Sequence, residues 1–154
     1  MGRRFLVLLL VASLLMIVAL PTAKAQPRVS NSNSVHIVDA YYADLDEDGY
    51  EDDIKILVEF SFPNSDPSRV DLNLWITLPS GLTYNFRVSV YRAPSQSVLQ
   101  IDCIDMASES GWYTVTMLAS IMGAGNGKMY ITDDFSFDPP TGGGPGLPTV
   151  YAYF

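Results

Sequence analysis

The stretch that decides the fold is Val70-Asp-Leu-Asn-Leu-Trp-Ile-Thr-Leu-Pro-Ser-Gly-Leu-Thr-Tyr-Asn-Phe-Arg-Val-Ser-Val90. Apolar side chains occupy alternate positions on both sides of its turn, Pro79-Ser80-Gly81. A period of two is typical of a strand that buries one face, and a short glycine-containing turn between two such runs indicates a hairpin. This stretch therefore predicts two antiparallel strands that share one apolar face.

The same alternation continues along the chain in both directions from the hairpin. It predicts seven strands, at about 35–43, 54–62, 70–78, 82–91, 97–103, 112–122 and 128–137. The separators are rich in Pro, Gly, Asn, Asp and Ser, as turns require. Because each strand has one apolar face, the strands must bury these faces against one another. We therefore expect an all-β domain over residues 26–138, an antiparallel β-sandwich of about seven strands.

The first 25 residues have the pattern of a secretory signal peptide. Arg3 and Arg4 precede an apolar run that ends at Leu20, and Ala23-Lys24-Ala25 is a small-x-small cleavage pattern. The run is shorter than the roughly 20 residues of a membrane-spanning helix. We predict cleavage after Ala25 and a secreted or cell-surface protein without a membrane span. An N-terminal anchor that is not cleaved is the alternative.

Composition narrows the choice of partners. The net charge is −8, and loss of Arg3, Arg4 and Lys24 with the signal would bring it to about −11. Such a chain repels phosphate backbones, which argues against nucleic acids and anionic membrane surfaces as partners. Cys103 is the single cysteine, so the domain has no internal disulfide. We expect this side chain to be a small buried apolar residue, and the domain to gain stability from a large core or a bound metal.

The end of the chain changes character. Residues 139–148 are rich in proline and glycine and predict a linker, and residues 149–154 form a short, aromatic, β-prone segment. One hypothesis is that this last segment adds a strand to the open sheet edge of a neighbouring copy.

One motif links the strand plan to a known fold. Glu109-Ser110-Gly111-Trp112-Tyr113-Thr114-Val115 resembles the entry to strand F of immunoglobulin-like domains. The resemblance implies that Tyr113 is a corner tyrosine whose hydroxyl bonds to upstream backbone. Val115 stands where antibody domains have a disulfide cysteine. The pattern is therefore similar to the disulfide-free immunoglobulin-like and fibronectin-like modules of microbial surface proteins.

The strongest chemical signal is the acidic run from residue 44 to residue 53. Seven of the 17 acidic residues of the chain lie in this window, which contains no Lys or Arg. Carboxylates at the first, third and fifth positions of a tight loop converge on one point, and glycine at the sixth allows the turn. A backbone carbonyl at the seventh position and a carboxylate at the ninth complete the shell. The predicted metal ligands are Asp44, Asp46, Asp48, Tyr50 and Asp52, with Asp53 as the alternative to Asp52.

This run resembles the Asp-x-Asp-x-Asp-Gly-x-x-Asp calcium loops of dockerins, thrombospondin type 3 repeats and integrin-type surface repeats. It departs from a full EF-hand, because Lys55 stands at the twelfth position and the flanks are predicted strands. An all-oxygen set favours Ca²⁺ over zinc or copper. Since the loop joins the first two predicted strands, we expect a stabilising calcium ion; a solvated acidic turn is the alternative.

Catalytic constellations are not convincing in this sequence. His36 is the single histidine and lies in a predicted strand, and Cys103 has no recognisable histidine partner. The pairs Asp102/Asp105 and Asp133/Asp134 have the composition of a glycosidase site, but such pairs arise by chance in an acidic chain.

The sequence thus predicts a secreted, non-enzymatic, calcium-binding module with a structural or adhesive role at the cell surface. Two alternatives stay open. A carbohydrate-binding module would use Trp75, Tyr91 and Trp112, which fall on the polar sides of their strands, and a self-assembling surface or filament subunit would use residues 149–154 as a donor strand. The candidate partners besides calcium are another surface protein, a polysaccharide or copies of the chain itself.

Overall fold

The computed structural model describes residues 32–125, 127–138, 144 and 146–154. The predicted signal peptide and most of the predicted linker lie outside the described residues. Eight strands follow one another along the chain: β1 (Ser34–Ala43), β2 (Asp53–Ser61), β3 (Arg69–Thr77), β4 (Thr83–Tyr91), β5 (Gln96–Ile104), β6 (Tyr113–Met122), β7 (Lys128–Phe137) and β8 (Thr149–Tyr153). In this part of the chain, no helix is long and apolar enough to cross a membrane.

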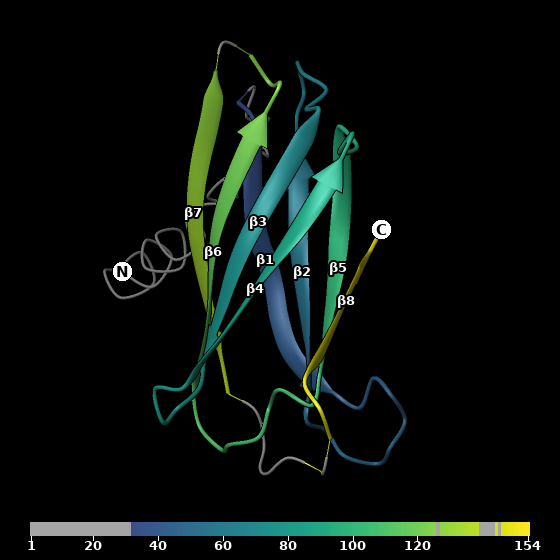
Figure 1. The fold of residues 1–154 in the computed structure, drawn as a ribbon, viewed down its shortest axis with the longest axis vertical. Helices are drawn as coiled ribbons and strands as arrows, with labels where there is room; N and C mark the ends of the chain where they lie inside the picture. The colour runs from purple at the N-terminus through teal and green to yellow at the C-terminus, as the bar shows by residue number, and fades with distance from the viewer. Residues whose placement is uncertain (1–31, 126, 139–143, 145) are drawn as a thin grey trace, which may run out of the picture.

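The strands form two antiparallel sheets that face each other (Figure 1). One sheet has the order β1-β2-β5-β8 and the other the order β4-β3-β6-β7. Hairpins join β1 to β2, β3 to β4 and β6 to β7, whereas the other connections cross from one sheet to the other. The prediction of an all-β antiparallel sandwich is confirmed.

The core lies between the sheets, and the predicted apolar faces build it. In β2, β3 and β6 the alternate side chains that the sequence assigned to the core are completely buried, among them Ile56, Leu74 and Met117. In β4, Val90 is buried, but Tyr84, Phe86 and Val88 are only partly buried because β4 lies at the edge of its sheet. A strand at the edge has a neighbour on one side only and therefore loses less surface to packing.

On one side of the sandwich, a hydrogen bond joins the edge strands β1 and β7 of the two sheets. The Ile37 backbone N–H donates to Asp133 Oδ2 at 2.8 Å, next to a β-bulge between Ile37 and Asp39. A bulge twists an edge strand and removes part of its free hydrogen-bonding groups. The outer strands on the other side are β4 and β8.

The eighth strand is the difference from the sequence prediction of seven. Residues 149–153 pair with β5 of the same chain, with Val150 opposite Cys103 and Tyr153 opposite Gln100. Five residues are too few for a reliable alternation, and the proline- and glycine-rich segment before them separates them from the rest of the pattern. Cys103 is completely buried beside this strand, as predicted, and burial raises the pKa of its thiol.

Tyr113 pins the connection between β5 and β6. Its hydroxyl accepts a hydrogen bond from the Glu109 N–H at 2.8 Å and donates one to the Glu109 carbonyl at 3.0 Å. The Glu109 carboxylate in turn accepts hydrogen bonds from the backbone N–H and the hydroxyl of Ser80, in the turn between β3 and β4. The buried ring stacks on Phe137 with ring centroids 5.7 Å apart. Tyr113 therefore joins two connections at the same end of the sandwich.

We expect Tyr113→Phe to lower the free energy of unfolding by about 1.5 kcal/mol, because the ring stays packed while both hydrogen bonds of the hydroxyl are lost. Urea denaturation of the mature chain measures the loss. Tyr130→Phe is the matched control, since Tyr130 is largely exposed on β7. Equal stabilities of the two variants would contradict the role of the Tyr113 hydroxyl.

Asp71 is a buried charge on the outer face of the second sheet. Its carboxylate accepts hydrogen bonds from Arg69 Nε at 2.7 Å and from Ser89 Oγ at 2.6 Å, and it also binds Arg87. Burial alone would raise the pKa of this carboxyl, but the hydrogen bonds from Ser89, Arg69 and Arg87 outweigh it and lower the pKa. The ionised form is therefore stabilised in the folded state and ties β3 to β4.

We expect Asp71→Asn to cost about 2 kcal/mol at neutral pH, where the wild-type carboxylate holds two guanidinium groups. Because the folded pKa is lowered, this advantage is fully present above the unfolded value of about 3.9 and is lost as the pH falls through the folded pKa. Unfolding free energies of both proteins between pH 7 and pH 2 measure it. A difference that stays constant over this range would contradict the assignment.

Candidate metal centre

The acidic loop between β1 and β2 is wound around its own carboxylates. Asp44 accepts hydrogen bonds from the backbone N–H groups of Asp48 and Gly49, both at 3.1 Å. Glu47 and Gly49 have positive φ angles of 63° and 93°, which allow the tight turn. As a result, carboxylate oxygens of Asp44, Asp46 and Asp48 lie within 4.8 Å of one another. The structure thus brings together the three carboxylates at the alternating positions.

A second group of carboxylates adjoins the first and shares Asp48 with it. Oxygens of Asp48, Asp52 and Asp105 also lie within 4.8 Å of one another. Asp105 belongs to the connection between β5 and β6 and has a φ angle of 56°. The sequence offered Asp105 only as half of a chance pair with Asp102. Its place follows from the pairing of β2 with β5, in which Ile54 faces Cys103, so that Asp105 comes to lie beside Asp52.

Asp52 is the residue that points most directly to a ligand. Its side chain is buried, with 1 % of the residue exposed. One carboxylate oxygen, Oδ2, accepts a hydrogen bond from the Gly144 N–H, whereas Oδ1 is buried and has no hydrogen-bond partner among the described residues. A buried charged oxygen without a partner costs several kcal/mol unless a cation satisfies it.

Asp53 has a different role from its neighbour. Its Oδ2 accepts hydrogen bonds from the N–H groups of Leu45 and Asp46 at 2.6 and 3.2 Å, and its Oδ1 accepts one from the Asp105 N–H at 2.8 Å. The carboxylate is completely buried and satisfied by backbone. Of the two alternatives that the sequence left open, the geometry places Asp52 in the carboxylate cluster and Asp53 beneath it as an anchor.

Tyr50 was predicted to supply a backbone carbonyl. Its N–H donates to Asp48 Oδ1 at 2.8 Å, and its ring packs so closely on Gly144 that a Cβ there would lie 2.7 Å from a ring carbon. Tyr50 therefore shapes the loop and packs on Gly144.

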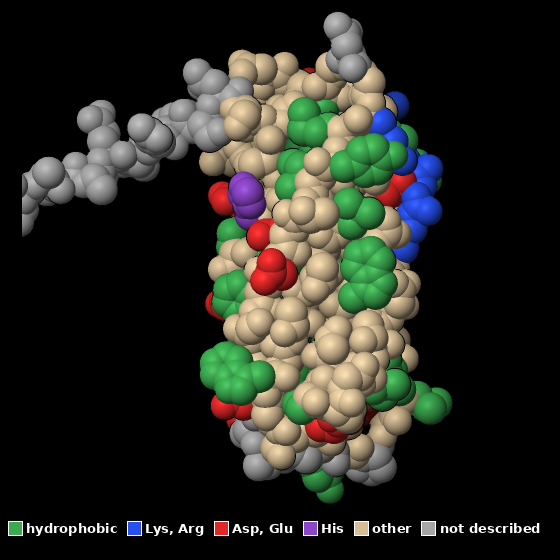
Figure 2. Space-filling view, turned by 90° about the vertical axis from the view of Figure 1, so that its left-hand side faces the viewer, with side chains coloured by type: hydrophobic (Ala, Val, Ile, Leu, Met, Phe, Trp, Pro, Cys, Tyr) green, Lys and Arg blue, Asp and Glu red, His purple; other side chains and the backbone are tan. Residues whose placement is uncertain are grey.

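Loss of hydration and like charges together raise pKa values in the cluster. Loss of hydration raises the pKa of Asp105, and the nearby carboxylates of Asp52, Asp46, Asp53 and Asp48 raise it further. The pKa of Asp46 is raised in the same way, against the hydrogen bond from the Asp48 N–H. The acidic loop lies at the lower end of Figure 1, and Figure 2 shows the visible Lys and Arg side chains gathered toward the upper end. A divalent cation would reverse the repulsion among these carboxylates.

The donor set fits a hard cation. Asp44, Asp46, Asp48, Asp52 and Asp105 offer only carboxylate oxygens, and they come from two connections at one end of the sandwich. Ca²⁺ accepts six to eight oxygen ligands in flexible geometry, partly from water, whereas Mg²⁺ requires a near-octahedral arrangement. Both groups of carboxylates, which share Asp48, are compatible with a hard cation such as Ca²⁺.

Comparison with known proteins gives no relative: no family model, no curated protein and no solved structure matches the chain.

The other residues that the sequence singled out do not converge on a site. His36 is exposed, with its Nδ1 3.7 Å from Asp133. Tyr91 and Trp112 are exposed but lie at opposite ends of the second sheet, and Trp75 is half-buried. The sequence did not anticipate the exposed tyrosines that β8 adds to the first sheet, Tyr151 and Tyr153.

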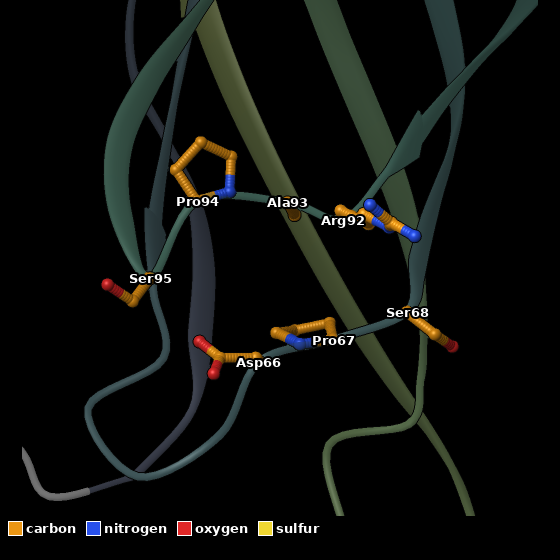
Figure 3. Close-up of a pocket in the computed structure, with 7 residues that line it drawn as sticks. All are labelled: Asp66, Pro67, Ser68, Arg92, Ala93, Pro94 and Ser95. Atoms are coloured by element: carbon orange, nitrogen blue, oxygen red, sulfur yellow. The ribbon is translucent and has the colours of Figure 1, made fainter.

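A shallow cavity of about 350 Å³ lies at the opposite end of the sandwich from the acidic loop (Figure 3). The connections β2–β3 and β4–β5 line it with Asp66, Pro67, Ser68, Arg92, Ala93, Pro94 and Ser95. The Ser68 and Ser95 side chains point away from it, and no histidine, cysteine or second carboxylate is among its lining residues. This cavity does not bring together a catalytic set.

The separate roles of Asp52 and Asp53 can be tested with two single substitutions. We expect Asp53→Ala to lower the free energy of unfolding by about 3 kcal/mol both in EDTA and in calcium, because three backbone N–H groups lose their acceptor. Asp52→Asn should leave stability in EDTA unchanged or higher, since it removes a buried unpartnered charge, and should abolish stabilisation by calcium. Chemical denaturation under both conditions measures this. A calcium response that survives in Asp52→Asn would contradict the assignment.

Proposed function

We propose that this chain is an exported, non-enzymatic β-sandwich module that binds Ca²⁺ at one end and has a structural or adhesive role at the cell surface. The observation that carries the proposal is the carboxylate of Asp52: its buried Oδ1 has no partner among the described residues, and one of its oxygens lies within 4.8 Å of oxygens of Asp48 and Asp105. A bound cation supplies the missing partner and offsets the repulsion of the neighbouring charges.

The strand order supports an immunoglobulin-like assignment. Immunoglobulin domains place strands ABED in one sheet and CFG in the other, with C′ added beside C in variable-type domains. The orders β1-β2-β5-β8 and β4-β3-β6-β7 correspond to this plan, with β8 in the place of strand D. Tyr113, at the start of β6, corresponds to the corner tyrosine of strand F, because its hydroxyl bonds to the backbone of Glu109.

The position of the centre supports a stabilising role for the ion. Its carboxylates come from the connection β1–β2 and from the connection β5–β6, so one ion would join the ends of three strands of the first sheet. The chain has no disulfide to do this, and Cys103 is buried. A calcium ion would thus take the place of a covalent cross-link in an exported domain.

Export agrees with the proposed ion. The residues before Gln26 have the composition of a signal peptide. Extracellular calcium modules work with dissociation constants of about 10⁻⁴–10⁻³ M, which suits a centre whose carboxylates at Asp44, Asp46 and Asp48 are exposed. The partner that we propose for the module is another surface protein, which would bind to the outer faces of the two sheets.

Thermal unfolding of the mature chain in EDTA and in millimolar calcium tests the proposal. Binding at 100 times the dissociation constant adds about 2.7 kcal/mol, and we expect the Tm to rise by several degrees. Asp48→Asn and Asp105→Asn should lose this rise, whereas Asp66→Asn, at the opposite end of the domain, should keep it. No rise in the wild type, or an equal rise in all three variants, would overturn the calcium site.

A further inference from the structure

The candidate metal centre is in direct contact with the segment that leads to β8. The Gly144 N–H donates to Asp52 Oδ2, and the Tyr50 ring leaves no room for a Cβ at Gly144. Gly146 lies so close to the Asp105 carboxylate that a side chain there would collide with it. One carboxylate of the centre therefore binds Gly144, and a second lies against Gly146.

β8 itself is held by few interactions. It pairs with β5 alone, and its side chains are exposed except for the partly buried Val150. Tyr153 joins Lys55 and Asp102 in a small polar network, with Lys55 Nζ 2.6 Å from the Tyr153 hydroxyl. Phe154 packs edge-to-face on the core residue Phe60 at 5.9 Å. A short strand with little buried surface belongs to the least stable part of a fold.

Detachment of β8 would open the sheet. The groups of β5 between Gln100 and Ile104 that now bond to β8 would lose their partners, and the buried side chains of Ile101 and Cys103 would be uncovered. An unpaired edge of this kind accepts a further strand. The strand that fits its register and side chains is the one it already binds, and a second copy of the chain carries the same strand.

We propose that the cation locks β8 onto its own chain, and that removal of the cation frees β8 to pair with β5 of a second copy. The inference rests on the proposed calcium site and adds a second role for the ion, the control of β8. With the ion bound, Asp52 and Asp105 are held together and keep Gly144 and Gly146 in place. Without the ion, the carboxylates repel one another, and the segment before β8 loses its support.

Cys103 reports directly on the state of β8. It is the single cysteine of the chain, is completely buried and lies opposite Val150. The rate of its reaction with a disulfide reagent such as DTNB can be measured on the full mature chain in EDTA and in millimolar calcium. We expect the reaction to be at least about tenfold slower in calcium. Hydrogen exchange of the β3 and β6 amides, measured in parallel, reports the unfolding of the whole domain. In EDTA we expect the free energy of opening obtained from Cys103 to be smaller than that obtained from these amides, which separates release of β8 from unfolding of the domain.

Exchange between copies is measured on the same samples by light scattering after size exclusion. We expect monomers in calcium and, in EDTA, a dimer fraction that grows with concentration and reverts when calcium is restored. The samples contain salt at about 0.15 M, which limits the range of the electrostatic repulsion between the acidic copies to roughly 8 Å. Monomers at every concentration in EDTA would overturn the exchange between copies.

A substitution in β8 tests the coupling from the other side. Val150→Asp weakens the docking of β8 but removes no carboxylate from the centre. Since coupling between two sites is reciprocal, we expect calcium to bind this variant at least about fivefold more weakly. Val38→Asp, an exposed position of β1 at the other edge of the same sheet, is the matched control and should bind calcium as the wild type does.

Calorimetric titration with calcium separates failure of the lock from failure of the site. If calcium binds with normal affinity but leaves the Cys103 reaction rate unchanged, the lock is overturned and the calcium site stands. If the wild type does not bind calcium at all, the site is overturned and the lock with it.

Discussion

The buried carboxylate of Asp53 is the interaction on which the acidic end of the molecule depends. It accepts hydrogen bonds from the N–H groups of Leu45, Asp46 and Asp105 and thereby joins the connection β1–β2 to the connection β5–β6. Hydrogen bonds to a buried charge are stronger than those between neutral groups. The backbone thus holds Asp52 and Asp105 close together although both carry negative charge. A cation bound here would therefore need neither a disulfide nor a helix end to keep its ligands together.

Most of the fold follows from the alternation of side chains. In β2, β3 and β6 the alternation is long and regular. The observed first and last residues of these strands differ from the predicted ones by no more than one position. The sequence did not predict β8 as a strand of the sandwich, because five residues after a Pro/Gly-rich segment are too few to show a reliable alternation. Its partner, β5, lies far away in the sequence, and local periodicity contains no information on which strands pair.

The candidate site divides in the same way between local and distant information. Asp44, Asp46 and Asp48 could be found because the loop that gathers them is continuous in sequence, and its glycine marks the turn. Asp105 could not, because its proximity to Asp52 arises from the register of β2 on β5. The sequence also could not distinguish the roles of Asp52 and Asp53, because both are buried carboxylates. Only the structure shows that Asp53 accepts backbone hydrogen bonds, whereas Oδ1 of Asp52 has no partner among the described residues.

The position of Asp52 makes the acidic end sensitive to a cation, because its carboxylates repel one another without a cation and would be held together by one. Without a cation, the buried carboxylate of Asp52 lies beside those of Asp48 and Asp105, so like charges repel one another next to the hydrogen bond that holds Gly144. A bound cation would turn this repulsion into attraction and would keep Asp52 and Asp105 close to Gly144 and Gly146. Because β8 has little buried surface of its own, a change in the charges at its base would affect it more than the strands whose side chains fill the core. The weakest strand of the sandwich is therefore the one that the proposed ion would influence most.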